Sequence, residues 1–206
     1  MHRINVALLL ASLFPAIGLC APAQVPAGKM YRGEMLDIRA PNSEGWSLID
    51  STPGGWSFAR EGSGPHESYV ASVSAFPLNE TTDSEEFLEL IKTGVEKDTS
   101  PNRFTITGVT LEYTEARGYP CVKYQATTED KKAKLSFWNR KPQKLQVYSL
   151  YCRHPKRSTL GFAIIFSHRG SDLDANLERE GQDFVSGVQV PTDAAVPLSD
   201  EKNDDT

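Results

Sequence analysis

The segment Gly161–Phe166, with the sequence Gly-Phe-Ala-Ile-Ile-Phe, most constrains the fold of this chain. A strand with one face in water alternates apolar and polar residues, whereas a short run that is apolar throughout fits a strand covered on both faces. We therefore expect this segment to be a central strand of a sheet, with other elements packed against it from both sides.

The segments before and after this run indicate one α+β domain. Two helices are expected: one over 84–97, begun by a capping pair of Thr82 with Glu85 or Asp83 with Glu86, and one over 173–186. Together with the strands, this order predicts a mostly antiparallel sheet of about six to seven strands with the two main helices packed on it. Strands are expected over 30–39, 46–50, 56–60, 69–76, 104–113, 119–128, 134–138, 145–152 and 160–168.

Two features predict how these elements pack. Gly181 lies on the apolar stripe of the second helix, where a glycine costs about 1 kcal/mol of helix propensity. We expect a close approach of helix and sheet to compensate that cost. Trp46 and Trp56 flank a Pro-Gly turn and are expected to pack into the core.

The N-terminal residues predict export. Residues 1–23 read as a signal peptide, because an apolar run over 6–14 precedes the small residues Ala21-Pro22-Ala23. Pro15 and Gly18 interrupt the run, so we expect no retained membrane span.

We assume a bacterial source and predict a periplasmic or secreted protein. Cys20 stands where a bacterial lipoprotein carries its lipid, although Leu19 replaces the usual small residue, so a lipid anchor is the alternative. Beyond the signal we expect a flexible segment over 24–29, a globular domain over 30–190 and an acidic, disordered tail over 191–206.

After signal removal two cysteines remain, Cys121 and Cys152, and an even number in an exported chain favours a disulfide. If the two lie opposite each other on neighbouring strands, the hairpin is centred near Phe137 and residues 131–144 form a projecting tip. If the chain turns at 129–132 and again at 141–143, an extra strand separates the cysteines beyond bonding distance. Two buried free thiols are the alternative to the bond.

Charge is concentrated in one stretch. Residues 131–171 contain ten Lys or Arg and no acid, which leaves 12 basic and 27 acidic residues elsewhere. We expect the first part of this stretch to bind an anionic ligand or surface, such as lipid head groups, a polyanionic glycan or an acidic protein. Peripheral membrane contact would fit, whereas the acidic total argues against nucleic acid. The candidate residues are Lys131, Lys132, Lys134, Trp138, Arg140, Lys141 and Lys144.

Three alternatives to this binding role remain open. The lysines over 131–144 could instead only protect a sheet edge from aggregation. A second basic group, expected at a hairpin turn, consists of Arg153, His154, Lys156 and Arg157. No motif with catalytic or metal-ligand spacing is present, so we expect no catalytic residue, metal or cofactor. A hydrolase with a loop-assembled site and an immunity-type inhibitor are the competing functions.

The order of elements resembles the Mog1/PsbP-like fold, whose bacterial members include exported DcrB-like envelope proteins. The matching pieces are Glu44-Gly45-Trp46, the helix start Asp83–Leu88, the strands over 104–168 and the closing segment Phe184–Val188. The resemblance implies a binding or accessory role and brings no catalytic motif with it.

Overall fold

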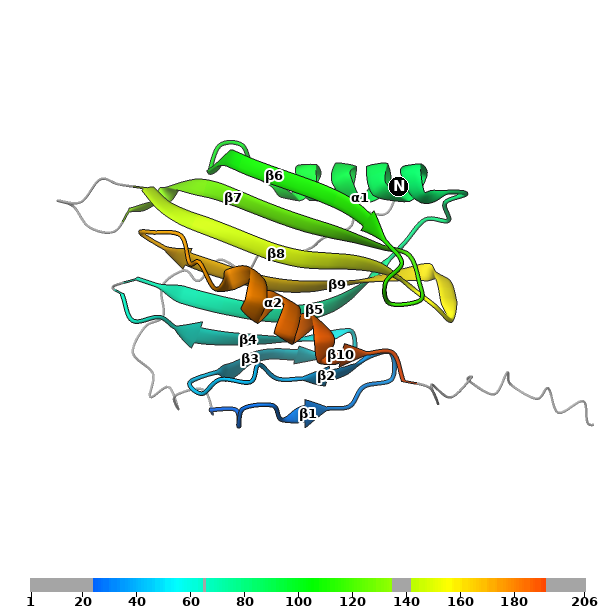
Figure 1. Ribbon diagram of the computed structural model, residues 1–206, viewed down its shortest axis with the longest axis horizontal. Coiled ribbons are helices and arrows are strands. Elements are labelled where there is room, and N and C mark those ends of the chain that lie inside the picture. Colours follow the sequence, from blue (N-terminus) through cyan, green and yellow to red (C-terminus); the bar gives the residue numbers. More distant parts are fainter. Residues whose placement is uncertain (1–23, 65, 135–141, 192–206) are drawn as a thin grey trace, which may run out of the picture.

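A seven-stranded antiparallel sheet forms the centre of the molecule (Figure 1). The computed structural model describes residues 24–64, 66–134 and 142–191. The strand order is β3-β4-β5-β9-β8-β7-β6, which together with two helices confirms the expected α+β class. The strands are β3 (Ser47–Thr52), β4 (Gly55–Glu61), β5 (Ser68–Pro77), β6 (Phe104–Thr114), β7 (Cys121–Lys134), β8 (Pro142–His154) and β9 (Arg157–Gly170).

The central position of β9 confirms the prediction for the apolar run. Phe162, Ile164 and Phe166 lie on one face of the strand and are almost completely buried. On the other face Ala163 is buried, whereas Ile165 is only partly so. The apolar run therefore identifies the strand at the middle of the sheet.

The second helix, α2 (Leu177–Ser186), packs closely on β8 and β9. A Cβ atom at Gly181 would lie 2.6 Å from Cδ1 of Tyr148, which confirms the expected close approach. The helix begins at residue 177 and not at 173, and Leu173 is exposed. Asp174 accounts for this later start, since its carboxylate accepts a hydrogen bond from the Tyr69 hydroxyl at 3.1 Å and ties the segment to the sheet.

A small second sheet closes this side of the core. It consists of β1 (Met30–Tyr31), β2 (Asp37–Arg39) and β10 (Val188–Gln189), in the order β1-β2-β10. The single strand predicted over 30–39 is thus wrong, because residues 32–36 form a loop between β1 and β2. The segment 24–29, expected to be flexible, is packed at Val25, which is buried and donates its N–H to the Trp46 carbonyl at 2.7 Å.

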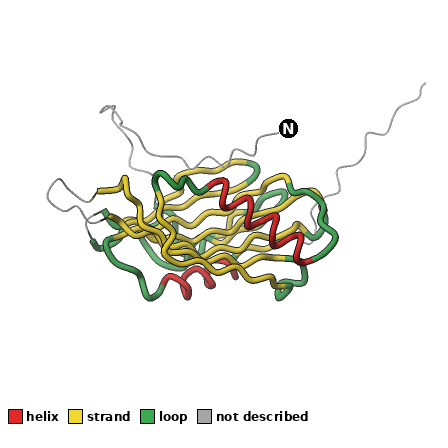
Figure 2. The backbone as a smooth tube through the Cα atoms, turned by 90° about the horizontal axis from the view of Figure 1, so that it is seen from above, coloured by secondary structure: helices red, strands yellow, loops and turns green. Residues whose placement is uncertain are grey.

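The first helix, α1 (Ser84–Asp98), lies on the opposite face of the main sheet (Figure 2). Its buried Phe87 and Ile91 form a second cluster with Val122 of β7. Of the two predicted capping pairs the second is present, since Asp83 accepts the Glu86 N–H at 2.9 Å. Neither described helix has the length and apolar content needed to cross a membrane.

Candidate functional site

The cysteine pair decides between the two strand orders left open by the sequence. Cys121 of β7 and Cys152 of β8 lie opposite each other in register and form a disulfide. The two strands are therefore direct neighbours, and the alternative with an intervening strand is wrong. Their pairing continues as far as Lys134 opposite Pro142.

The β7–β8 hairpin extends beyond the strands on either side of it. Strand β6 begins at Phe104, opposite Asp130, and β9 ends at Gly170, opposite Lys144. Within the described ranges, no third strand continues beside the hairpin past these points. The hairpin end therefore leaves the sheet as a pair of strands on its own.

Four of the candidate basic residues belong to the described stem of this hairpin. Lys131 and Lys132 are exposed, Lys144 is partly exposed, and Lys134 is the last residue of β7. The remaining candidates, Trp138, Arg140 and Lys141, lie outside the described residues.

A buried carboxylate fixes the base of the hairpin. Asp130 is completely buried and accepts two-pronged hydrogen bonds from Arg103, with Nη2 at 2.7 Å and Nε at 3.0 Å from its Oδ2. It also accepts the backbone N–H groups of Lys132 and Ala133 at 3.1 and 3.2 Å. Burial acts to raise the pKa of Asp130, but these hydrogen bonds outweigh it and hold the pKa below its usual value.

Two further contacts hold the same base from the other side. Arg169 of β9 places Nη2 3.4 Å from the Asp130 carboxylate, and burial lowers the pKa of this arginine. The buried side chain of Gln143 donates to the His66 carbonyl at 2.9 Å and so ties the hairpin to the loop between β4 and β5. The stem therefore has a rigid root in the sheet.

A polar pocket of about 590 Å³ adjoins this root. The histidine beside it, His168, is buried, with Nε2 2.8 Å from Glu67 Oε1 and Nδ1 3.3 Å from Gln146 Oε1. Both ring nitrogens of His168 therefore have hydrogen-bond partners within the protein. The pocket is lined by Glu61, Gly62, Gly64, His66, Glu67, Ser68, Gln143 and Arg169.

The second basic group lies at the other end of the sheet, in the β8–β9 turn. His154 is buried, its Nδ1 accepts the Lys156 N–H at 3.2 Å, and burial lowers its pKa. Arg153 donates to Asn79 and Thr81, in the segment that leads into α1. The structure thus separates this turn from the hairpin stem. Arg153, His154 and Lys156 make hydrogen bonds there, and Lys156 and Arg157 are exposed.

The ion pair of Arg103 and Asp130 is the part of the site that the sequence prediction missed. The buried face of β7 carries Val122, Tyr124, Ala126 and Thr128 at every second position, and the same alternation places Asp130 on that face. A charged residue at a buried strand position requires a partner. The alternation along β7 was therefore the signal in the sequence from which a buried ion pair at Asp130 could have been predicted.

The described residues contain no group of three or more potential metal ligands.

Comparisons with known proteins give structural neighbours only. No family model and no curated sequence matches the chain. The Ran-binding protein Mog1p of Saccharomyces cerevisiae is similar in structure, with 11% identity and a TM-score of 0.45 over 76% of this chain and 90% of that chain. A single-residue mutant of Mog1 is similar with 11% identity and a TM-score of 0.46, over 83% and 96% of the two chains. Both structural neighbours are Mog1 proteins, the group named in the resemblance drawn from the sequence.

Proposed function

We propose that this chain is a non-enzymatic exported protein that binds an anionic partner through the basic β7–β8 hairpin. The observation that carries the proposal is the continuation of β7 and β8 past both neighbouring strands, to Lys134 and Pro142. A hairpin end with no flanking strand can approach a surface without obstruction from the rest of the sheet.

Charge supports the same conclusion. Residues 131–144 contain six Lys or Arg and no acid, in a chain whose formal net charge is −5. Each basic residue close to an anionic membrane contributes about 1 kcal/mol of attraction, which salt screens over about 8–10 Å. An anionic surface would therefore meet the hairpin end first and orient the acidic remainder away from itself.

The disulfide supports export, because such bonds persist in oxidising compartments and are rare in the cytosol. Mass spectrometry of the protein recovered from the envelope fraction tests this part of the proposal. We expect a mature N-terminus at Gln24, and labelled palmitate incorporated at Cys20 would instead establish the lipid-anchored form. An intact N-terminus at Met1 on the recovered protein would refute cleavage.

Co-sedimentation with vesicles of anionic or zwitterionic phospholipid tests the binding face. The double variant Lys131→Ala/Lys132→Ala should bind anionic vesicles roughly 25-fold more weakly, at about 1 kcal/mol per charge. The matched control is Lys156→Ala/Arg157→Ala, which removes the same charge at the opposite end of the sheet and should leave binding unchanged. Equal losses in both variants would show that only total charge matters, and equal binding to both vesicle types would refute an anionic surface as the partner.

A further inference from the structure

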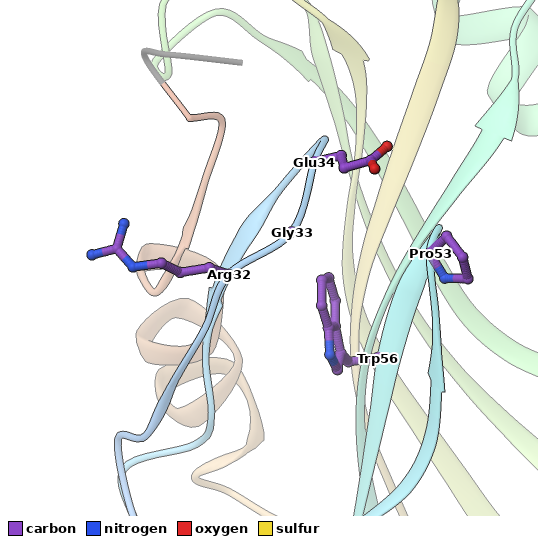
Figure 3. Close-up of a pocket in the computed structure, with 5 residues that line it drawn as sticks. All are labelled: Arg32, Gly33, Glu34, Pro53 and Trp56. Atoms are coloured by element: carbon purple, nitrogen blue, oxygen red, sulfur yellow. The ribbon is translucent and has the colours of Figure 1, made fainter. Parts of the chain in front are cut away.

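A separate small pocket lies at the edge of the sheet that carries the N-terminal segment (Figure 3). Its walls come from the loop between β1 and β2, from the turn between β3 and β4 and from the start of β4, and its volume is about 440 Å³. The lining residues are Arg32, Gly33, Glu34, Pro53 and Trp56. None of them belongs to the basic hairpin, so this pocket is independent of the function proposed above.

Trp56 forms the aromatic wall of the pocket. The indole is partly buried and packs against the rim of the main core, with the ring of Tyr31 centred 6.5 Å away. Gly33 lies directly against its outer edge, since a Cβ atom there would be 2.4 Å from Trp56 Cη2. The loop therefore touches the edge of the indole, and the ring borders the cavity.

The two charged residues of the pocket differ in their orientation. Arg32 points away from Trp56 in Figure 3, and its Nη1 lies 3.5 Å from the carboxylate of Asp37. Asp37 also accepts the Gly33 N–H at 3.3 Å, which fixes the loop in this form. Glu34 instead extends on the side of Pro53, so a carboxylate is the charge that faces the cavity (Figure 3).

An aromatic ring with a carboxylate beside it is a setting for an organic cation. A Lys ammonium or Arg guanidinium above an indole is attracted by the negative face of the ring, and Trp is the best of the aromatic residues for this contact. A carboxylate adds an ion pair, and the apolar sides of Trp56 and Pro53 suit the methylene groups of such a ligand.

We propose that this pocket binds a monovalent alkylammonium or guanidinium group, seated on Trp56 and paired with Glu34. A Lys or Arg side chain of a partner protein and a free small amine both carry this chemistry. The chain would then have two oppositely selective sites, one for anions at the β7–β8 hairpin and one for a cation at the opposite edge of the sheet.

Titration with capped lysine (acetyl-lysine methylamide) tests the proposal, with capped norleucine as the uncharged control of similar shape. The readout is the indole N–H signal of Trp56 in a ¹H–¹⁵N correlation spectrum at low salt, identified by its loss in Trp56→Phe. We expect capped lysine to shift this signal and to bind about 3- to 30-fold more tightly than capped norleucine. Butylammonium titrated in parallel distinguishes the sources: equal affinity indicates a free amine, and tighter binding of capped lysine indicates a protein side chain.

Two variants assign the charge requirement to the pocket. Glu34→Gln should weaken capped lysine about two- to five-fold and leave capped norleucine unchanged. The matched control is Glu44→Gln, which removes the same charge from an exposed position outside the pocket and should change neither ligand. Equal affinities for the two capped ligands, equal effects of the two variants, or no shift of the Trp56 signal would each overturn the proposal.

Discussion

Replacing Asp130 by Asn tests whether the base of the hairpin depends on a buried charge. The change keeps the shape of the side chain but leaves Arg103, whose side chain is only 11% exposed, and Arg169 beside an uncharged group. Breaking a buried ion pair in this way costs about 3–5 kcal/mol, since the remaining charge has lost its partner. With a urea slope of about 1–3 kcal/mol/M, the unfolding midpoint should fall by at least about 1 M.

Urea unfolding at pH 7, followed by far-UV circular dichroism, measures this loss. The matched control is Glu178→Gln, which removes an exposed ion pair with Lys123 (3.1 Å) and should change the unfolding free energy by less than about 1 kcal/mol. A loss below about 1 kcal/mol for Asp130→Asn would refute the reasoning, because it would mean that the two arginines do not need the charge.

The pH dependence of the same variant gives a second test. The pKa of Asp130 is lower in the folded state than its ordinary value of 3.8, so the folded protein favours the charged form. The stability that this provides is fully present above the unfolded pKa and is lost as the pH falls through the folded value. The difference between wild type and Asp130→Asn should therefore be constant from neutral pH down to about pH 5 and then shrink.

Three further predictions concern the fold. Gly181→Ala should destabilise the protein in thermal unfolding because its Cβ would meet Tyr148, whereas Gly94→Ala in α1, with no atom within 4 Å, should stabilise it by about 1 kcal/mol. Replacing both Cys121 and Cys152 by Ala should cost about 3–4 kcal/mol in denaturant unfolding, from the chain entropy of a 31-residue loop. The buried, neutral His154 has a lowered pKa, so the stability of wild type should fall as the pH drops below about 6.5, and this part of the loss should be absent in His154→Gln.

Much of the fold could be predicted because apolar spacing reports which faces of an element are buried. The run at 161–166 identified the central strand, and Gly181 on the apolar stripe identified the close contact of α2 with the sheet. The cysteine pair also linked the order of the strands to a single bond, since a disulfide between β7 and β8 is possible only when the two strands are neighbours.

The missed features depend on contacts between distant parts of the chain. Arg103 and Asp130 are 27 residues apart, and only the register of β6 with β7 brings them together. The loop between β1 and β2 likewise contacts a distant part of the chain, since Gly33 lies against Trp56, more than 20 residues further along. The role of Trp138 stays a prediction, because it lies outside the described residues.

The disulfide also determines what happens when the backbone of the hairpin is cut. Cys121 and Cys152 join β7 to β8 at the end of the pair opposite the tip, so every peptide bond of the tip lies inside the covalent loop. A cut between Lys134 and Pro142 would produce two fragments that run together on a denaturing gel without reductant and separate on that gel after reduction. Because the cut falls beyond the ends of β6 and β9, the seven-stranded sheet keeps all its strands, and Lys131, Lys132 and Lys144 remain on the hairpin stem.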